Sequence, residues 1–190
     1  VILSTGYLSE VVERYFAAQP VPGVTVACVP ETTPLGTAGG FLNCLGAARQ
    51  VPSSWLVLNG DSLVYADLSM AAALLADPPT ECVVMGVQMD DASRYGRIAF
   101  DTAGRLQSFQ EKIPGSGVIN AGVYFFKPCA VARFPRQTPL SFEKDVFPKL
   151  LADGAKLLVS QTNAPFLDIG TPESLPQAEA FIASRERELL

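Results

Sequence analysis

The chain has 190 residues, of which 48% are hydrophobic and 17% charged, and its formal net charge is −5. This apolar content is enough for one well-formed core, and we expect a single domain over residues 1–190. Because the positive charges form no basic block, the composition argues against nucleic acid binding through phosphate neutralisation. No apolar stretch reaches membrane-spanning length, so no membrane partner is expected.

Histidine is absent and the cysteines are scattered, which narrows the possible chemistry. Without histidine there is no Ser-His-Asp or Cys-His catalysis and no zinc site built on imidazole. Any catalysis must therefore rest on carboxylates, lysine, arginine, tyrosine, backbone amides or a bound ion. The four cysteines, Cys28, Cys44, Cys82 and Cys129, form no C-x-x-C pair. We expect buried thiols in a reducing cytoplasm rather than disulfides or metal ligands.

Strand and helix patterns alternate along the first half of the chain. The predicted elements are strands at 1–5, 24–29, 55–59 and 81–87, and helices at about 8–18, 38–49 and 70–75. This βαβαβαβ order is typical of a parallel, doubly wound sheet. The continuous apolar run at 55–58 in particular indicates a strand that is covered on both faces.

The second half of the chain follows a different pattern. A β-hairpin is predicted at 97–109, a long strand at 118–126, helices at about 141–153 and 172–188, and a short strand at 156–160 between them. The whole order predicts an α/β fold with a mixed, mainly parallel sheet flanked by helices and a β-hairpin insertion. This arrangement resembles a GT-A-like (Rossmann-like) nucleotide-sugar fold. Because the chain opens inside a strand, we expect it to be truncated at the amino terminus.

Two aspartates follow short apolar segments and are the first candidate ligands. Asp61 comes directly after the strand at 55–59 and Gly60, at a strand end of the kind where ligands gather in parallel sheets. Asp168 likewise follows apolar residues and precedes a glycine and a helix. The alternatives are an ordinary turn for Asp61 and a helix cap for Asp168, although Thr171 is the better placed N-cap. The two carboxylates could meet around one Mg²⁺, with phosphate oxygens and water completing its octahedron.

Three further segments carry polar or glycine residues at informative places. The loop Pro34-Leu35-Gly36-Thr37-Ala38-Gly39-Gly40 lies before a helix, where glycines and unpaired amides could approach a base or a phosphate. Small residues that serve only packing are the alternative. Glu111 and Lys112 end a hairpin strand and could be an exposed ion pair. Asn120 lies in an apolar strand, so it is either a satisfied core amide or a ligand contact.

The ordered set of motifs resembles the sugar-1-phosphate nucleotidyltransferases. The motifs, which run over nearly the whole chain, are "TGYLSE", "PLGTAGG", "LVLNGDS", "YGRIAFDTAGRLQSFQEK", "INAGVYFF", "SFEKDVFPKL" and "FLDIGTPESL". "INAGVY" followed by "SFEKDVFPKL" is most similar to the heptose-1-phosphate guanylyltransferase branch. Mannose-1-phosphate guanylyltransferases and the related uridylyl- and thymidylyltransferases come next.

The resemblance implies a reaction and a role for each candidate residue. The sugar 1-phosphate would attack the α-phosphorus of an NTP, with GTP the expected donor and heptose or mannose 1-phosphate the expected acceptor. The implied roles are metal binding for Asp61 and Asp168, a nucleobase wall for Gly36, Thr37 and Gly39, sugar contacts for Gly96, Glu111 and Asn120, and neutralisation of the sugar phosphate for Lys112. The attacking phosphate is already an anion, so positioning and charge neutralisation suffice and no histidine base is needed.

Two departures from the family pattern limit the expectation. The chain reads Glu111-Lys112-Ile113-Pro114 where the family has Glu-Lys-Pro, and it lacks the family's amino-terminal glycine-rich loop with its arginine and lysine. We therefore expect these 190 residues alone to have little or no transferase activity. A non-catalytic nucleotide-sugar-binding or regulatory subunit is the alternative. A glycosyltransferase of similar fold is a second alternative, but the Asp-x-Asp motif typical of that class is missing from Asn59-Gly60-Asp61-Ser62-Leu63 at the end of the strand at 55–59.

Overall fold

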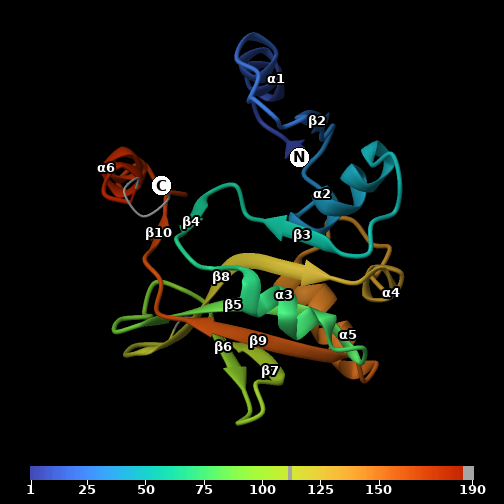
Figure 1. Ribbon diagram of the computed structural model, residues 1–190, viewed down its shortest axis with the longest axis vertical. Helices are drawn as coiled ribbons and strands as arrows, with labels where there is room; N and C mark the ends of the chain where they lie inside the picture. The colour runs from blue at the N-terminus through green and yellow to red at the C-terminus, as the bar shows by residue number, and fades with distance from the viewer. Residues whose placement is uncertain (111–112, 186–190) are drawn as a thin grey trace. The chain divides into compact units, whose positions relative to one another are not determined.

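The computed structural model describes residues 1–110 and 113–185 (Figure 1). The chain forms two compact units, one of Val1–Ser53 with Arg133–Leu150 and the other of Ser54–Ala132 with Leu151–Leu190. Each unit is described by itself below.

The first unit contains a two-stranded parallel sheet and several helices. Its elements are β1 (Ile2–Thr5), α1 (Ser9–Ala18), β2 (Ala27–Pro30), α2 (Thr37–Cys44), a 3₁₀ turn (Leu45–Ala47), a π-helical turn (Phe142–Val146) and the start of α5 (Phe147–Ala152). β1 pairs in parallel with β2. Phenylalanine rings 6.0–6.1 Å apart link α2 to the segment that returns at residues 134–147, through Phe41, Phe134, Phe142 and Phe147. Aromatic contacts at this spacing stabilise the unit.

The second unit is built on a six-stranded mixed sheet. The strands of the sheet are β3 (Trp55–Leu58), β5 (Thr80–Met89), β6 (Arg97–Phe100), β7 (Leu106–Gln110), β8 (Gly117–Phe126) and β9 (Lys156–Thr162), while β4 (Ser62–Val64) and β10 (Phe166–Asp168) form a separate pair. The helices of the unit are α3 (Ser69–Ala76), α4 (Pro128–Val131) and α6 (Ala178–Ala183), with a 3₁₀ turn at Leu175–Gln177. The strand order is β7-β6-β8-β5-β9, and β3 also pairs with β8. β5 and β9 are parallel, whereas β8 is antiparallel to β3, β5 and β6. The α/β class with a mixed sheet and a β6–β7 hairpin is thereby confirmed.

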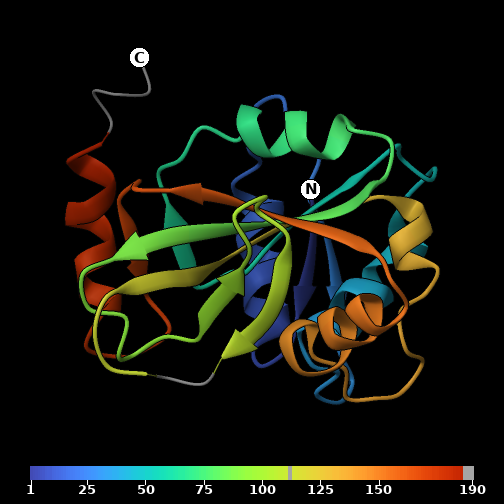
Figure 2. The ribbon, with the colours of Figure 1, turned by 90° about the horizontal axis from the view of Figure 1, so that it is seen from below.

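The core of the second unit lies between helix α3 and one face of this sheet (Figure 2). Alternate residues of β5 and β8 face the helix, as the period of a strand requires. The buried set comprises Ala71, Leu75, Val83, Met85, Val87, Ile119, Ala121, Val123, Phe125 and Leu158, with Ala92 from the loop after β5. Residues of β8 such as Tyr124 alternate with this set and are buried on the other face.

Several expectations need correction. β3 is not covered on both faces, since the side chains of Leu56 and Leu58 are 46% and 59% exposed. The strand is also antiparallel to its neighbour β8 and not part of a parallel pair. The strand expected at 24–29 begins only at Ala27, and the α-helix expected from residue 172 begins at Ala178 after a 3₁₀ turn. The three-residue strand β4 was not expected at all.

The cysteines are all free thiols, as expected, but not all are buried. Cys44 and Cys82 are buried, Cys28 is half-buried and Cys129 is exposed. Burial raises the pKa of Cys44 and raises the pKa of Cys82 well above its usual value. In the part of the chain that the structure describes, no helix is both long and apolar enough to span a membrane.

Candidate active site

The two candidate metal ligands, Asp61 and Asp168, lie beside each other in the second unit. β4 and β10 form an antiparallel pair in which Ser62 is opposite Asp168. Just before β4, the Asp61 carbonyl accepts a 2.8 Å hydrogen bond from the Ile169 amide. The pairing thus joins two turns that are more than a hundred residues apart in sequence. It places the two aspartates at the same end of this small ribbon.

The two carboxylates converge on the space next to Gly170. A Cβ atom built on Gly170 would lie 3.0 Å from Asp168 Oδ1 and 3.0 Å from Asp61 Oδ2. The Gly170 amide also donates a 2.8 Å hydrogen bond to Asp168 Oδ1, which fixes that carboxylate. Any side chain at position 170 would fill the space that the two oxygens share. The glycine therefore keeps a small, oxygen-lined site open.

This donor set fits a hard divalent cation that is shared with a phosphate ligand. Among the described residues, no group of three or more histidine, cysteine, aspartate or glutamate side chains could hold a metal ion. A pair of carboxylates is nevertheless what Mg²⁺ commonly takes from a protein when substrate phosphates and water supply its other ligands. Asp61 is exposed and Asp168 is half-buried, so both can reach a ligand from solvent.

Gly96 and Asn120, the expected sugar contacts, are joined by the backbone. The Asn120 amide donates a 3.2 Å hydrogen bond to the Gly96 carbonyl. A Cβ on Gly96 would approach only the Gln110 carbonyl, at an ordinary 3.6 Å. Packing does not demand glycine at position 96, and the residue is exposed. Its predicted contact with a sugar is compatible with this open backbone.

The side chain of Asn120 already has partners within the sheet. Its Nδ2 donates to the Tyr124 hydroxyl at 2.8 Å, and its Oδ1 accepts from the Gly122 amide at 3.1 Å. Of the two alternatives that the sequence left open, a satisfied amide describes this arrangement. Contact of Asn120 with a sugar hydroxyl stays a prediction.

The glycine loop before α2 lies in the first unit, where it packs against Leu140. The Leu140 carbonyl accepts hydrogen bonds from the amides of Ala38 and Gly39, at 3.0 and 3.2 Å. The expectation of unpaired amides at this helix start is therefore wrong for these two residues. Gly36 has φ +78°, and a Cβ there would lie 2.5 Å from the Leu140 carbonyl oxygen. Glycine at position 36 is thus required by backbone conformation and close packing.

The other two predicted residues of this loop are also in close contact with the returning segment. The Thr37 hydroxyl accepts a 3.2 Å hydrogen bond from the Phe142 amide. A Cβ on Gly39 would lie 3.0 Å from the Leu35 side chain. These contacts make the loop well defined. A role as a nucleobase wall for Gly36, Thr37 and Gly39 remains a prediction.

Glu111 and Lys112 lie outside the described residues, but the loop that follows them is described. Arg97 lies against Gly117, and its Nη2 donates to the carbonyls of Pro114 and Gly115, at 2.8 and 2.5 Å. This guanidinium holds the end of the loop between β7 and β8.

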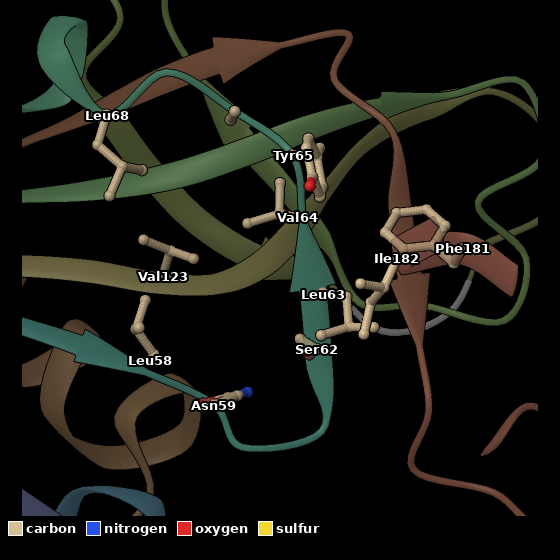
Figure 3. Close-up of a pocket in the computed structure, with 11 residues that line it drawn as sticks. Leu58, Asn59, Ser62, Leu63, Val64, Tyr65, Leu68, Val123, Phe181 and Ile182 are labelled. Atoms are coloured by element: carbon tan, nitrogen blue, oxygen red, sulfur yellow. The ribbon is translucent and has the colours of Figure 1, made fainter. Parts of the chain in front are cut away.

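A pocket of about 270 Å³ lies next to the Asp61 turn, between β3, β4 and α6 of the second unit (Figure 3). Its lining is apolar except for Asn59, Ser62 and Tyr65, and the Tyr65 hydroxyl is buried without a hydrogen-bond partner. Charged phosphates and polyhydroxylated sugars need more polar partners than this lining offers. The pocket is therefore not the expected substrate site.

Comparison with known proteins identifies the family. The profile of the family described as "Nucleotidyl transferase" matches residues 1–185. The chain belongs to this nucleotidyl transferase family. It is 34% identical over 183 residues to the mannose-1-phosphate guanylyltransferase of Mycobacterium tuberculosis, covering 95% of this chain and 50% of that protein. It is 29% identical over 177 residues to the mannose-1-phosphate guanylyltransferase catalytic subunit beta of Danio rerio, covering 91% and 49%.

A solved structure that is similar to this chain is that of HddC from Yersinia pseudotuberculosis, which was crystallised with GMP-PN. The TM-score is 0.81 at 28% identity, over 95% of this chain and 77% of that one. The resemblance to sugar-1-phosphate nucleotidyltransferases that the motifs indicate is confirmed by these matches. The chain spans about half the length of the curated relatives it matches.

Sequence reasoning missed two glycines that shape the site, Gly170 and Gly122. Gly170 stood in the quoted motif "FLDIGTPESL", yet only the fold reveals that both carboxylates approach it. Gly122 has φ +70° inside β8. A glycine within an otherwise apolar strand is a signal for a bulge or a close backbone approach, and it could have marked this position.

Proposed function

We propose that the protein transfers a nucleotidyl group from an NTP to a sugar 1-phosphate and releases pyrophosphate. GTP is the proposed donor, and mannose or heptose 1-phosphate the proposed acceptor. The convergence of Asp61 and Asp168 on one open point beside Gly170 carries the proposal. Family membership, the guanylyltransferase names of the relatives and the GMP-PN ligand of HddC support it.

In the proposed reaction, a phosphate oxygen of the sugar 1-phosphate forms a bond to the α-phosphorus of GTP. The bond between the α-phosphorus and the bridging oxygen of the β-phosphate breaks, and the electron pair leaves with pyrophosphate. No proton has to be removed from the nucleophile at neutral pH. The protein therefore contributes mainly by positioning the two substrates and by balancing their charge.

Nucleotidyltransferases of this kind generally work with a divalent metal ion, and we propose that it is Mg²⁺ here. Asp61 and Asp168 would hold it, and when bound it would neutralise negative charge on the nucleotide phosphates. Lys112 would neutralise the sugar phosphate, and Glu111, Asn120 and the Gly96 backbone would orient the sugar. Gly36, Thr37 and Gly39 would contact the nucleobase.

We also propose a cytoplasmic location, where NTPs and sugar phosphates are available. The free thiols and the absence of a membrane-spanning helix among the described residues are compatible with it.

Labelled nucleotide tests the proposal. Protein from the complete reading frame would be incubated with [α-³²P]GTP, mannose 1-phosphate and Mg²⁺, and the products separated. The label should move into a nucleotide sugar of the mass of GDP-mannose, or into GDP-heptose when heptose 1-phosphate is supplied. A non-catalytic binding subunit would bind nucleotide sugar and leave the label in GTP, which would contradict the proposed activity.

A further inference from the structure

The Asp61 turn is attached to an irregularity in β8. Between the pairs Val84–Tyr124 and Gly86–Asn120, β5 has one residue and β8 has three. We call residues Ala121–Val123 of β8 the Gly122 bulge. Bulges of this kind interrupt a ladder and redirect neighbouring groups, and they are common next to active sites.

The Gly122 bulge holds the residue that begins the Asp61 turn. The Asn59 amide donates a 2.8 Å hydrogen bond to the Gly122 carbonyl. The side chain of Asn59 lies directly against the glycine, since a Cβ on Gly122 would be 2.7 Å from Asn59 Nδ2 and 2.8 Å from its Cβ and Cγ. Figure 3 shows Asn59 at the end of β3, where the chain turns towards Ser62. Only glycine, at its φ of +70°, lets the turn approach this closely.

The bulge is in turn held from inside the sheet. Asn120 spans it, accepting from the Gly122 amide and donating to the Tyr124 hydroxyl. Tyr124 is completely buried, so it lies out of reach of a ligand in solvent. On the other side of the Gly122 bulge, the backbone amide of Asn120 donates a hydrogen bond to the Gly96 carbonyl. One irregularity of β8 is therefore connected to the Asp61 turn and to Gly96.

We propose that Gly122 is a positioning residue for the metal site, acting through Asn59 on Asp61. This inference rests on the proposed function, because it assumes that Asp61 and Asp168 bind a divalent ion. The Asp61 turn is fixed at two points: the Asn59–Gly122 hydrogen bond before it and the Asp61–Ile169 hydrogen bond within it. Displacement of the first point moves the Asp61 carboxylate away from Asp168.

Substitution of Gly122 by alanine tests the proposal, with Mn²⁺ as the probe. Paramagnetic broadening of the Ile169 and Gly170 amide signals would be followed in ¹⁵N-labelled protein. Gly122→Ala should raise the Mn²⁺ concentration for half-broadening about tenfold, the lower range for residues that support metal ligands. Removing the clashing side chain in the double variant Gly122→Ala/Asn59→Gly should return that concentration most of the way to the wild-type value.

Gly154→Ala is the matched control. Gly154 lies in the same unit at a similar φ of +74°, but nothing lies within 4 Å of a Cβ there. Gly154→Ala introduces comparable backbone strain without a contact like that between residues 122 and 59. The Mn²⁺ titration of this variant should therefore match that of the wild type. If Gly122→Ala fails to fold, Tyr124→Phe carries the test, because it removes a single hydroxyl that holds Asn120. That variant should require about threefold more Mn²⁺, the lower range of what the loss of one hydrogen bond produces, and so a smaller effect than direct displacement.

The outcomes distinguish the metal site at Asp61 and Asp168 from the positioning role of Gly122. Wild-type signals that do not broaden near Asp168 would refute the metal site itself, and the inference with it. If the wild-type signals broaden and a folded Gly122→Ala variant shows the same Mn²⁺ dependence, only the positioning role of Gly122 is refuted. Failure of the Asn59→Gly rescue would show that contact between residues 59 and 122 is not the cause.

Discussion

In protein from the complete reading frame, replacement of Asp61 by asparagine should reduce turnover strongly while leaving the folded protein as stable as before, or slightly more so. The Asp61 backbone carbonyl, not its side chain, makes the hydrogen bond to Ile169. The substitution therefore keeps the β4–β10 connection. It removes one of two negative charges that converge beside Gly170.

The magnitude of both effects follows from the geometry. Two distances of 3.0 Å to a shared point allow a carboxylate separation of at most about 6 Å, at which unit charges in water repel by about 0.7 kcal/mol. Relief of this repulsion should raise Tm by about 2 °C in a protein of this size. Turnover should fall by about 10²–10³-fold, because a charge that organises the phosphates is lost.

Thermal unfolding with and without Mg²⁺ and steady-state pyrophosphate release would measure the two effects. Mg²⁺ at ten times its Kd stabilises a protein by about 1.4 kcal/mol, which corresponds to about 3–5 °C in Tm. The wild type should show this shift and Asp61→Asn should not. Asp90→Asn, which changes an exposed carboxylate elsewhere in the second unit, should retain both the shift and the turnover. A near-normal rate for Asp61→Asn would mean that Asp61 is only a turn residue and holds no catalytic metal ion.

Two further predictions concern stability. Gly36→Ala should reduce the free energy of unfolding by about 2–3 kcal/mol, because a left-handed φ and contact with the Leu140 carbonyl act together. Gly154→Ala, with the same φ strain alone, should lose about 1 kcal/mol, and equal losses in urea unfolding would argue against the Leu140 contact. The Lys156 ammonium lowers the pKa of Asp77. The stabilisation that the Asp77 carboxylate gives the folded protein is therefore present above the unfolded-state pKa and is lost as pH falls through the folded-state pKa. Wild type and Asp77→Asn should differ in Tm at neutral pH and converge once the pH has fallen through the lowered, folded-state pKa of Asp77, and a constant difference would contradict this assignment.

The fold could be predicted from sequence where the pattern is local. The apolar run of β5 and the long β8 each have a composition that specifies a strand, and the turn residues at Asp101–Gly104 specify the hairpin between β6 and β7. The bounds of β2 and the open face of β3 could not be predicted, because both depend on which strand lies alongside. β4 has only three residues and shows no period, so it is defined solely by its pairing with β10.

The candidate site, like the fold, could be predicted only in part. Asp61 and Asp168 could be selected because each follows an apolar segment and adjoins a glycine. Their like placement predicted that they could meet, but the β4–β10 pairing that brings them together could not be predicted. The sequence pattern does not specify the hydrogen-bond partners of the Asn120 side chain. It also does not show that the amides of Ala38 and Gly39 donate to the carbonyl of Leu140, which is distant in sequence.

The most direct test of the central claim is pyrophosphate release by protein from the complete reading frame. GTP, ATP, UTP, CTP and dTTP would each be offered with heptose, mannose or glucose 1-phosphate, in the presence and absence of Mg²⁺. Release should depend on Mg²⁺ and be fastest with GTP and either mannose or heptose 1-phosphate. A folded protein that releases no pyrophosphate with any pair would contradict the proposed transferase activity and favour a nucleotide-sugar-binding role.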